Sequence, residues 1–289
     1  MKEKIRLALC QVSSVFAESD GQDPRPANLA KAEECIAQAS KMGADLAIFG
    51  EVFLTGYRSD NLISRYACSL DPPDEYVRSI AEIATKNSMH IIMGLATRAS
   101  HVTGAIYNTA VFFGPQGLLG AYRKVYLANF TYAKGVAYES VFYARGRELP
   151  VFHTDLGSIG IEICADLRHS EILRVYALKG AQIVVNIAAA AQGFEDYWDL
   201  AMRLGAMDNN FYFVMTSVVG QQKDDTFFGG SRVVDPYGQE IGRIKNKVEE
   251  VLVVELDLSV VREAREASHI FFERIPELYE IISKPIPYP

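Results

Sequence analysis

Apolar runs of strand length alternate with amphipathic stretches of helix length along almost the whole chain. Residues 5–12 form a mostly apolar run that is typical of a buried strand, and residues 28–42 carry apolar side chains at helical spacing. The same patterns predict further strands at 44–49, 90–97, 106–113, 118–123, 158–164, 182–187 and 212–217, and further helices at 75–87, 170–179 and 195–209. This alternation predicts an α/β fold or a layered α+β fold.

Turn sequences mark two hairpins. Gly-Pro-Gln-Gly at 114–117 predicts that strand 118–123 returns beside strand 106–113. Asp-Pro-Tyr-Gly at 235–238 predicts a last hairpin that returns through 251–256 before a final helix. Between the two turns, residues 126–148 are polar and aromatic without clear periodicity. Loops of this length inside compact domains are usually functional or disordered, and the aromatic residues favour function.

The pattern predicts a single domain over residues 1–275. Residues 276–289 follow as a C-terminal tail, and its proline-rich end at 284–289 (KPIPYP) cannot form a helix. Tails of this kind commonly lie on a partner surface or are frayed. We expect this one to pack on a partner subunit.

Composition and charge limit the classes of function. The 289 residues are 49% hydrophobic and 22% charged, as in ordinary globular proteins, so a full core can form without disulfides or metals. The net charge of -7 argues against binding to nucleic acid or anionic lipid. No stretch approaches the roughly 20 apolar residues that cross a bilayer, and the first apolar run is too short for a signal peptide. We therefore expect a cytoplasmic protein with a small-molecule partner and no membrane partner.

The four cysteines form no zinc-binding or disulfide pattern. Cys10, Cys35, Cys68 and Cys164 include no Cys-x-x-Cys pair and do not group with the five histidines. Cys10 and Cys35 fall in apolar patterns and are predicted to lie in the core.

Cys164 differs, because it closes the apolar strand 158–164 and precedes the start of a helix. Such an elbow holds a side chain at the rim of a sheet, where backbone N–H groups and the helix dipole favour a thiolate and a developing oxyanion. On geometry alone, a buried structural cysteine remains the alternative.

Two segments repeat one local order, in which a helix ends at Gly43 or Gly180 and a buried strand follows. Both glycines are predicted helix C-terminal caps. Chance recurrence and internal duplication both explain so short a match. In either case the far ends of the two strands face the same rim, where ligands tend to bind in layered α/β folds.

A thiol nucleophile needs a base, most often histidine, but no histidine of this sequence is well placed. Glu51 is the best candidate instead, because it follows the buried strand 44–49 in an apolar context, where burial raises a carboxyl pKa toward neutrality. The alternative for Glu51 is a structural pair with an arginine. Lys124 also stands at a strand end, where an ammonium can donate to an oxyanion. Taken alone, Lys124 is better explained as a solvated surface residue, so the case depends on three such residues at strand ends.

These residues resemble motifs of the nitrilase superfamily of carbon–nitrogen hydrolases, in order and over nearly the whole chain. Residues 50–57 (GEVFLTGY) are similar to its first block, 122–127 (YRKVYL) to its lysine block and 160–168 (GIEICADLR) to its cysteine block. Residues 107–110 (YNTA) and 229–238 (GGSRVVDPYG) are supporting matches. The resemblance implies a four-layer α-β-β-α sandwich.

Carried over residue by residue, the resemblance implies that Cys164 is the nucleophile, Glu51 the general base and Lys124 the stabiliser of the tetrahedral intermediate. In this mechanism Glu51 accepts the thiol proton and later protonates the leaving amine, while Lys124 and the Ala165 N–H hold the oxyanion. Water then hydrolyses the Cys164 thioester. The scheme has no task for a metal or an organic cofactor.

The family also places a second glutamate between the lysine and the cysteine, before a spaced aromatic and glycine. Glu139 matches this spacing with Tyr143 and Gly146. Glu148 is the rival, but Asp155 stands where its glycine should be. The implied role of Glu139 is to orient Lys124 and to help position the substrate.

Three positions depart from the family pattern. Gly50 replaces a frequent proline, Ala165 replaces a frequent aromatic residue, and 186–191 (NIAAAA) replaces a turn that commonly contains proline. Such small side chains favour an unusual pocket that admits a wider acyl group. The predicted substrate-binding residues are Tyr57, Ala165, Ala188 and Ala189.

The predicted function is hydrolysis of a non-peptide amide through a Cys164 thioester. The residues leave open a nitrilase, an N-carbamoyl amide hydrolase, a glutaminase subunit, an acyl transferase and a non-catalytic binding protein on the same fold. In the family, helices after the cysteine pack across a symmetric interface, which here involves 168–179 and 195–209. We therefore expect a homodimer or a larger symmetric homo-oligomer, with Trp198, Met202 and Met207 in the core or in this interface.

Overall fold

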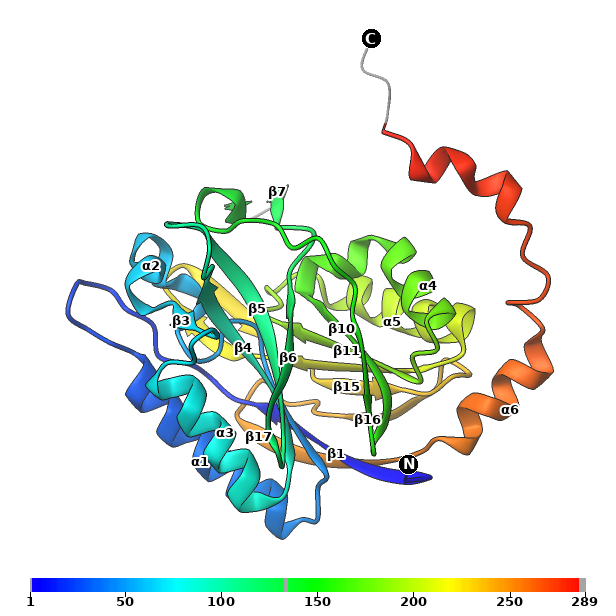
Figure 1. The fold of residues 1–289 in the computed structure, drawn as a ribbon, viewed down its shortest axis with the longest axis horizontal. Coiled ribbons are helices and arrows are strands. Elements are labelled where there is room, and N and C mark those ends of the chain that lie inside the picture. The colour runs from blue at the N-terminus through cyan, green and yellow to red at the C-terminus, as the bar shows by residue number, and fades with distance from the viewer. Residues whose placement is uncertain (1, 133–134, 286–289) are drawn as a thin grey trace.

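Two β-sheets pack face to face, and each carries helices on its outer surface (Figure 1). The computed structural model describes residues 2–132 and 135–285, without the side chains of residues 132, 135 and 136. The layers follow the order helix, sheet, sheet, helix, which confirms the predicted four-layer α-β-β-α sandwich.

The first sheet contains β1 (Lys4–Gln11), β2 (Leu46–Phe49), β3 (Cys68–Ser69), β4 (His90–Arg98), β5 (Ile106–Gly114), β6 (Gly117–Arg123) and β17 (Glu250–Asp257). Their order is β17-β1-β2-β4-β5-β6, with β3 paired to β4. β1, β2 and β4 run parallel to one another. β17, β5 and β6 each run antiparallel to their neighbours.

The second sheet contains β9 (Val151–Thr154), β10 (Gly157–Ile163), β11 (Ile183–Ala188), β12 (Tyr212–Ser217), β15 (Arg232–Val234) and β16 (Glu240–Arg243). Their order is β16-β15-β12-β11-β10-β9, and β10, β11 and β12 run parallel. Each sheet therefore has three parallel strands at its centre. Glu51 N–H, just beyond β2, donates to Ala188 O at the end of β11 (3.2 Å), so carboxyl ends of the two sheets meet at one edge.

Four helices cover the outer faces. α1 (Arg25–Lys41) and α3 (Glu75–Asn87) cover the first sheet, while α4 (Ser170–Leu178) and α5 (Glu195–Asn209) cover the second (Figure 1). α2 (Ile63–Tyr66) is a single short turn, and α6 (Ser259–Ser268) follows β17. None of the helices in the described ranges is both long and apolar enough to span a lipid bilayer.

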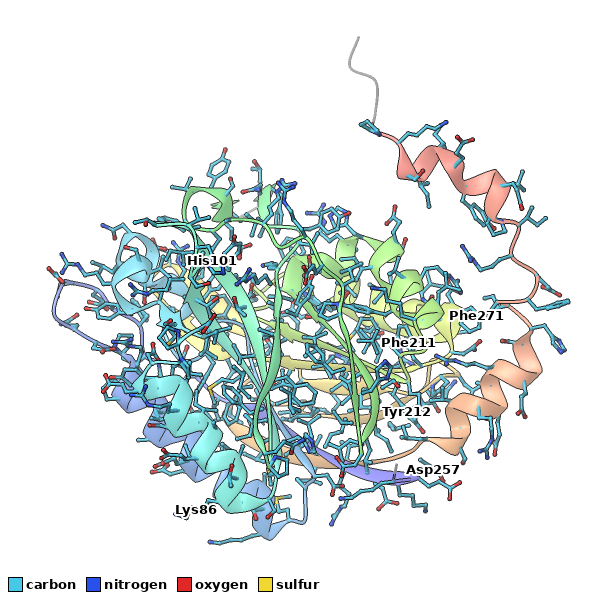
Figure 2. All side chains as sticks on the ribbon, viewed as in Figure 1. Lys86, His101, Phe211, Tyr212, Asp257 and Phe271 are labelled. Carbon is cyan, nitrogen blue, oxygen red and sulfur yellow. The ribbon has the colours of Figure 1, made fainter. Side chains whose placement is uncertain are left out.

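Side-chain alternation along the strands divides the apolar residues among the layers. On β1, Leu7 and Leu9 point into the core between the sheets, whereas Ala8 and Cys10 point toward α1 and α3. Figure 2 shows side chains filling the space between the sheets. Cys35 is buried in the same outer core as Cys10, as predicted for both cysteines.

Predicted and observed elements agree closely for β4 to β6, β10 to β12 and α3 to α5. The predicted returning strand of the last hairpin is wrong. The strand that returns after the turn at 235–238 is β16, whereas 251–256 belongs to β17 and pairs with β1 in the other sheet. The chain crosses between sheets at 244–249, where Gln11 Nε2 donates to the carbonyl oxygens of Asn246 (3.0 Å) and Val248 (2.9 Å).

The segment 126–148 also has more regular structure than its sequence indicates. It contains the short hairpin β7 (Asn129–Tyr132) and β8 (Gly135–Tyr138) and the 3-10 turn η2 (Glu139–Val141). Its residues 133 and 134 lie outside the described residues. Gly43 and Gly180 follow α1 and α4 with φ of 73° and 85°, which confirms both as C-terminal caps.

After α6 the chain leaves the body of the molecule as an arm, residues 272–285 (Figure 2). Phe271 anchors its base, because the guanidinium groups of Arg174 and Arg265 each lie 5.5 Å from the ring centroid. The arm carries the 3-10 segment η4 (Pro276–Ser283), none of whose residues is buried. The last four residues of the predicted tail, 286–289, lie outside the described residues.

The close approach of backbones behind Glu51 yields a stability prediction. A Cβ on Gly94 of β4 would lie 2.3 Å from Gly50 O and 2.4 Å from Val52 N, and neither backbone atom can turn aside. Gly94→Ala is expected to lower the free energy of unfolding by about 3 kcal/mol, as overpacking does, measured by urea denaturation. The control is Gly104→Ala, which has open space but a φ of 85° and is expected to lose about 1 kcal/mol. Equal losses for the two variants would contradict this account.

Candidate active site

Four chemically active side chains converge at the edge where the carboxyl ends of the two sheets meet. Glu51 follows β2, Lys124 follows β6, Cys164 follows β10, and Glu139 begins η2. Lys124 Nζ lies 2.6 Å from Glu51 Oε1 and 2.9 Å from the Glu139 carboxylate. The ammonium is thus held between two carboxylates, and Lys124 is fully buried rather than solvated.

Glu51 is fully buried, and both of its carboxylate oxygens accept hydrogen bonds. Oε1 accepts from Lys124 Nζ and from Asn108 Nδ2 (2.7 Å), while Oε2 accepts from Ala189 N–H (2.8 Å). The partner of Glu51 is therefore a lysine, not the arginine that the structural alternative assumed. Val52, the next residue, has a φ of 48°, a backbone conformation that β-branched residues rarely adopt and that is often stored at functional sites.

Three hydrogen-bond donors fix the carboxylate of Glu139. Its carboxylate accepts from Lys124 Nζ, from Tyr57 Oη (3.0 Å) and from Ala128 N–H (2.7 Å). Gly146 explains the spacing seen in the sequence, because its N–H donates to Lys124 O (2.8 Å) and a Cβ there would lie 2.0 Å from Arg123 O. Only glycine lets the segment after Glu139 close against the lysine strand.

The rival glutamate, Glu148, is exposed on the surface. Glu139, by contrast, is 5% exposed and contacts Lys124. The two glutamates therefore differ in their environment, although both match part of the sequence pattern.

The charges of this cluster depend on one another. Burial lowers the pKa of Lys124, but the charges of Glu139 and Glu51 outweigh this effect and hold the pKa well above its ordinary value. Burial also raises the pKa of Glu139, against the opposing charge of Lys124. The ammonium is consequently a permanent positive charge beside the thiol.

Cys164 lies at a sharp elbow between β10 and the 3-10 turn η3 (Cys164–Arg168), with a φ of 47°. Side chains bind the backbone on both sides of the elbow. Asp166 accepts from Ile163 N–H (2.9 Å), and Asn186 Oδ1 accepts from Cys164 N–H (3.0 Å). Asn186 is held in turn by donating its Nδ2 to the buried Glu162 (2.7 Å).

The surroundings of Cys164 favour the neutral thiol over the thiolate. Burial raises the pKa of Cys164 well above its ordinary value, and the charge of Glu51 and its hydrogen bond to the thiol act in the same direction, against Lys124. A base must therefore remove the proton as the sulfur attacks. Glu51 acts on the thiol through its charge and a hydrogen bond, whereas His169, the histidine nearest in sequence, stacks on Tyr126 with ring centroids 3.4 Å apart.

A cavity of about 1050 Å³ opens above Cys164. Tyr57, Ala165 and Ala189 line it, together with Glu139 and Cys164. Ala188, which we expected to contact substrate, is fully buried at the end of β11 and is not among the described residues that line the cavity. Its carbonyl accepts from Glu51 N–H and Val218 N–H (3.0 Å), so the small residues reach the cavity one position later than expected.

Two asparagines of the site were not among the predicted site residues. Asn108 contacts Glu51, and it stands in the segment 107–110, which the sequence had marked only as a supporting match. Asn186 contacts Cys164 from the start of the run 186–191, which was noted only for its small residues. In the described part of the chain, no group of His, Cys, Asp and Glu side chains has an arrangement that could hold a metal ion.

Comparisons with known proteins agree with this geometry. The family model for carbon-nitrogen hydrolase matches residues 6–266. A nitrilase of Pyrococcus abyssi is 30% identical over 95% of this chain and 99% of its own length, and the omega-amidase NIT2 of Bos taurus is 30% identical over 96% and 98%.

The structural comparison gives the same result. The crystal structure of Saccharomyces cerevisiae Nit3, a member of branch 10 of the nitrilase superfamily, superimposes with a TM-score of 0.81 at 27% identity, covering 92% of this chain and 94% of that one. The family model spans most of the chain, and the cluster of thiol, ammonium and two carboxylates lies within the matched residues. The chain therefore belongs to the carbon–nitrogen hydrolase family of the nitrilase superfamily and is an enzyme that hydrolyses carbon–nitrogen bonds.

Proposed function

We propose that the enzyme is an amidase in which Cys164 is the nucleophile, Glu51 the general base and acid, Lys124 the oxyanion donor and Glu139 the residue that positions Lys124. One observation carries this proposal. A buried ammonium is paired with two carboxylates at 2.6 and 2.9 Å, close to a cysteine thiol that lines a cavity. That set of groups meets the needs of acyl transfer from an amide.

Acylation begins when Glu51 accepts the proton of Cys164 and the sulfur forms a bond to the amide carbon. The carbonyl oxygen becomes an oxyanion, which Lys124 and the Ala165 N–H stabilise. The intermediate then collapses, the carbon–nitrogen bond breaks, and Glu51 returns its proton to the leaving nitrogen. Ammonia or an amine departs, and the acyl group remains as a thioester on Cys164.

Deacylation repeats the sequence with water as the nucleophile. Glu51 takes a proton from the water as its oxygen attacks the thioester carbon. The carbon–sulfur bond breaks, the sulfur recovers the proton from Glu51, and a carboxylic acid is released. The same carboxylate serves as base and acid in both halves, which requires no second titrating group.

Replacement of the nucleophile is the first test. Cys164→Ala is expected to lower kcat by roughly 10⁴-fold, because both chemical steps pass through the sulfur, while circular dichroism and the unfolding midpoint stay near wild type. Incubation of the wild type with a slowly deacylating amide is expected to add one acyl mass to the peptide that contains Cys164. A folded Cys164→Ala protein with wild-type turnover would refute the mechanism. So would a protein that never acylates, which would indicate a binding function only.

The two glutamates that match the sequence pattern provide a paired test. Glu139→Gln removes one of the two charges that hold Lys124, so kcat is expected to fall about 10²-fold, as it does when an oxyanion donor is misplaced. The matched control is Glu148→Gln, at the exposed rival position, and its kcat is expected to stay within about twofold of wild type. Equal losses in the two variants would remove Glu139 from the mechanism.

A panel of amides, nitriles and ureido acids tests which class of carbon–nitrogen bond the enzyme cleaves. One relative is described as a nitrilase and another as an omega-amidase, so the names alone favour neither. We expect release of ammonia from amides and none from nitriles or ureido acids, because the residues present meet every need of amide hydrolysis. Activity on nitriles alone would end the amidase proposal.

We further propose that the enzyme is a homodimer, or a larger symmetric homo-oligomer, assembled through the outer face of α5. Trp198 and Met202 point inward on this helix and are buried. On the opposite side Leu200, Leu204 and Met207 are 69%, 59% and 49% exposed at spacings of four and three residues. A helix that is apolar on both sides is expected to be covered.

The arm supports the same proposal. Phe272, Leu278 and Ile281 are 91%, 70% and 79% exposed, and the segment extends from the body of the molecule beyond Phe271 (Figure 2). An isolated segment with this much exposed apolar surface has no core of its own. We propose that the tail from residue 276 packs on the partner subunit while residues 1–275 form one domain.

Charge placed on this surface tests the assembly. Leu204→Asp combined with Ile281→Asp is expected to convert the oligomer to a monomer, because an ionised carboxylate cannot be buried without a partner, as measured by light scattering at micromolar concentration. The control is Val102→Asp, which is also exposed (59%) but lies on the loop between β4 and β5. A monomeric wild type would contradict the proposal.

We also propose that the enzyme works in the cytoplasm. Its four cysteines are all free thiols, which is the state maintained in a reducing compartment.

A further inference from the structure

Glu51 is fully buried at the base of the cavity, because Ala189 and Glu139, which line the cavity, bind Glu51 and Lys124 respectively. The cavity is lined by Cys164 and Glu139, but neither Glu51 nor Lys124 is among its described lining residues. The two halves of a substrate, the acyl group and the leaving group, therefore meet different amounts of space.

The backbone behind Glu51 is closely packed. A Cβ on Gly50 would lie 2.6 Å from Val218 N, and one on Gly94 would lie 2.3 Å from Gly50 O. Both oxygens of Glu51 are already occupied by hydrogen bonds from Lys124, Asn108 and Ala189. A leaving nitrogen that takes its proton from Glu51 must approach a fully buried carboxylate, beside which a large substituent has less space than in the cavity.

The cavity side is wide and predominantly apolar. Near the sulfur the wall is made of small residues, Ala165, Ala189 and Ala190. Farther out it is aromatic, with rings contributed by Phe130, Phe142, Phe194, Tyr197, Trp198 and Phe227. The rings of Phe130 and Phe194 meet edge to face, with centroids 6.0 Å apart.

Among the described charged residues of the cavity wall, most are paired with opposite charges. Arg58 pairs with Asp60 (3.5 Å) and Asp225 (3.2 Å), and Lys223 also pairs with Asp60. Arg168 is exposed and lies over the ring of Phe130 (4.7 Å), so solvent screens its charge. The interior of the cavity therefore favours an uncharged, apolar group over a small acidic one.

We infer that the substrate is a primary amide of a bulky, apolar carboxylic acid that carries an aromatic ring. Its ring occupies the aromatic end of the cavity, and ammonia is the leaving group on the side of Glu51. This inference rests on the proposed amidase function and specifies the substrate class of the same site.

Two constitutional isomers separate the two sides of the site. 3-Phenylpropanamide has a bulky acyl group and releases ammonia, whereas N-benzylacetamide has a small acyl group and releases a bulky amine. We expect kcat/KM to be higher for 3-phenylpropanamide by on the order of 10²-fold, the discrimination that a shaped apolar pocket supplies. Equal values, or a preference for N-benzylacetamide, would overturn the inference.

Two further primary amides keep the reacting group constant and vary only the acyl part. 3-Phenylpropanamide is expected to exceed acetamide and succinamic acid by at least about tenfold in kcat/KM. A higher value for succinamic acid would assign the cavity to acidic substrates and overturn the apolar half of the inference. If acetamide is hydrolysed and 3-phenylpropanamide is no better, the inference fails while the amidase proposal stands. If none of the primary amides releases ammonia, the amidase proposal itself fails.

A substitution of Phe130 tests where the aromatic ring of the substrate binds. Phe130→Ala is expected to lower the ratio of kcat/KM for 3-phenylpropanamide over acetamide by about tenfold, the effect of losing one aromatic contact. The control is Tyr237→Ala, which removes an exposed ring away from the cavity and is expected to leave the ratio unchanged. Titration of the Cys164 thiol with iodoacetamide corrects each rate for the fraction of folded sites. An unchanged ratio in folded Phe130→Ala would contradict the placement of the ring.

Discussion

The site depends on one interaction, the burial of the Lys124 ammonium between the carboxylates of Glu51 and Glu139. Desolvation of each ion costs several kcal/mol, and the three groups offset this only because they meet at hydrogen-bonding distance with additional donors from Asn108 and Tyr57. With these three groups ionised and the thiol neutral, the cluster carries a net charge of -1. In the proposed mechanism, transfer of the thiol proton to Glu51 moves one negative charge from the carboxylate to the sulfur without changing the total. The reaction therefore begins without adding charge to a buried region.

The four-layer fold is what brings these groups together. The side chains come from the ends of β2, β6 and β10 and from a 3-10 turn, so no short segment of chain could assemble them. The hydrogen bond between Glu51 N–H and Ala188 O joins the two sheets at this edge. The bond from Ala189 N–H to Glu51 Oε2 then orients the carboxylate from the second sheet. The contacts that join the two sheets at this edge therefore also orient the Glu51 carboxylate.

Much of this arrangement could be predicted from the sequence, because strands buried on both faces and caps such as Gly43 and Gly180 leave local signals. Glu51, Lys124 and Cys164 were candidates because each stands at the end of an apolar strand, but their roles, and Glu139 as a fourth residue, were implied only by the resemblance to the family. The sheet that β17 joins could not be predicted from the sequence. The choice of partner strand depends on tertiary packing rather than on the local alternation of apolar and polar residues in 251–256. The roles of Asn108 and Asn186 were missed for a similar reason. An amide at a strand position has no distinctive pattern, and its partners are distant in sequence.

The hydrogen bond from Tyr122 Oη to Asp166 Oδ2 (2.6 Å) links the segments that carry Lys124 and Cys164. Tyr122 precedes Lys124 by two residues on one strand, and Asp166 follows Cys164 by two residues at the elbow. Asp166 also accepts from Ile163 N–H, and Asn186 accepts from Cys164 N–H, so both amides beside the strained backbone of Cys164 are fixed by side chains. A left-handed conformation persists in a non-glycine residue only when its surroundings over-determine it. Here Asp166, which holds the elbow in this conformation, also binds Tyr122, so one side chain links the Cys164 elbow to the strand that leads to Lys124.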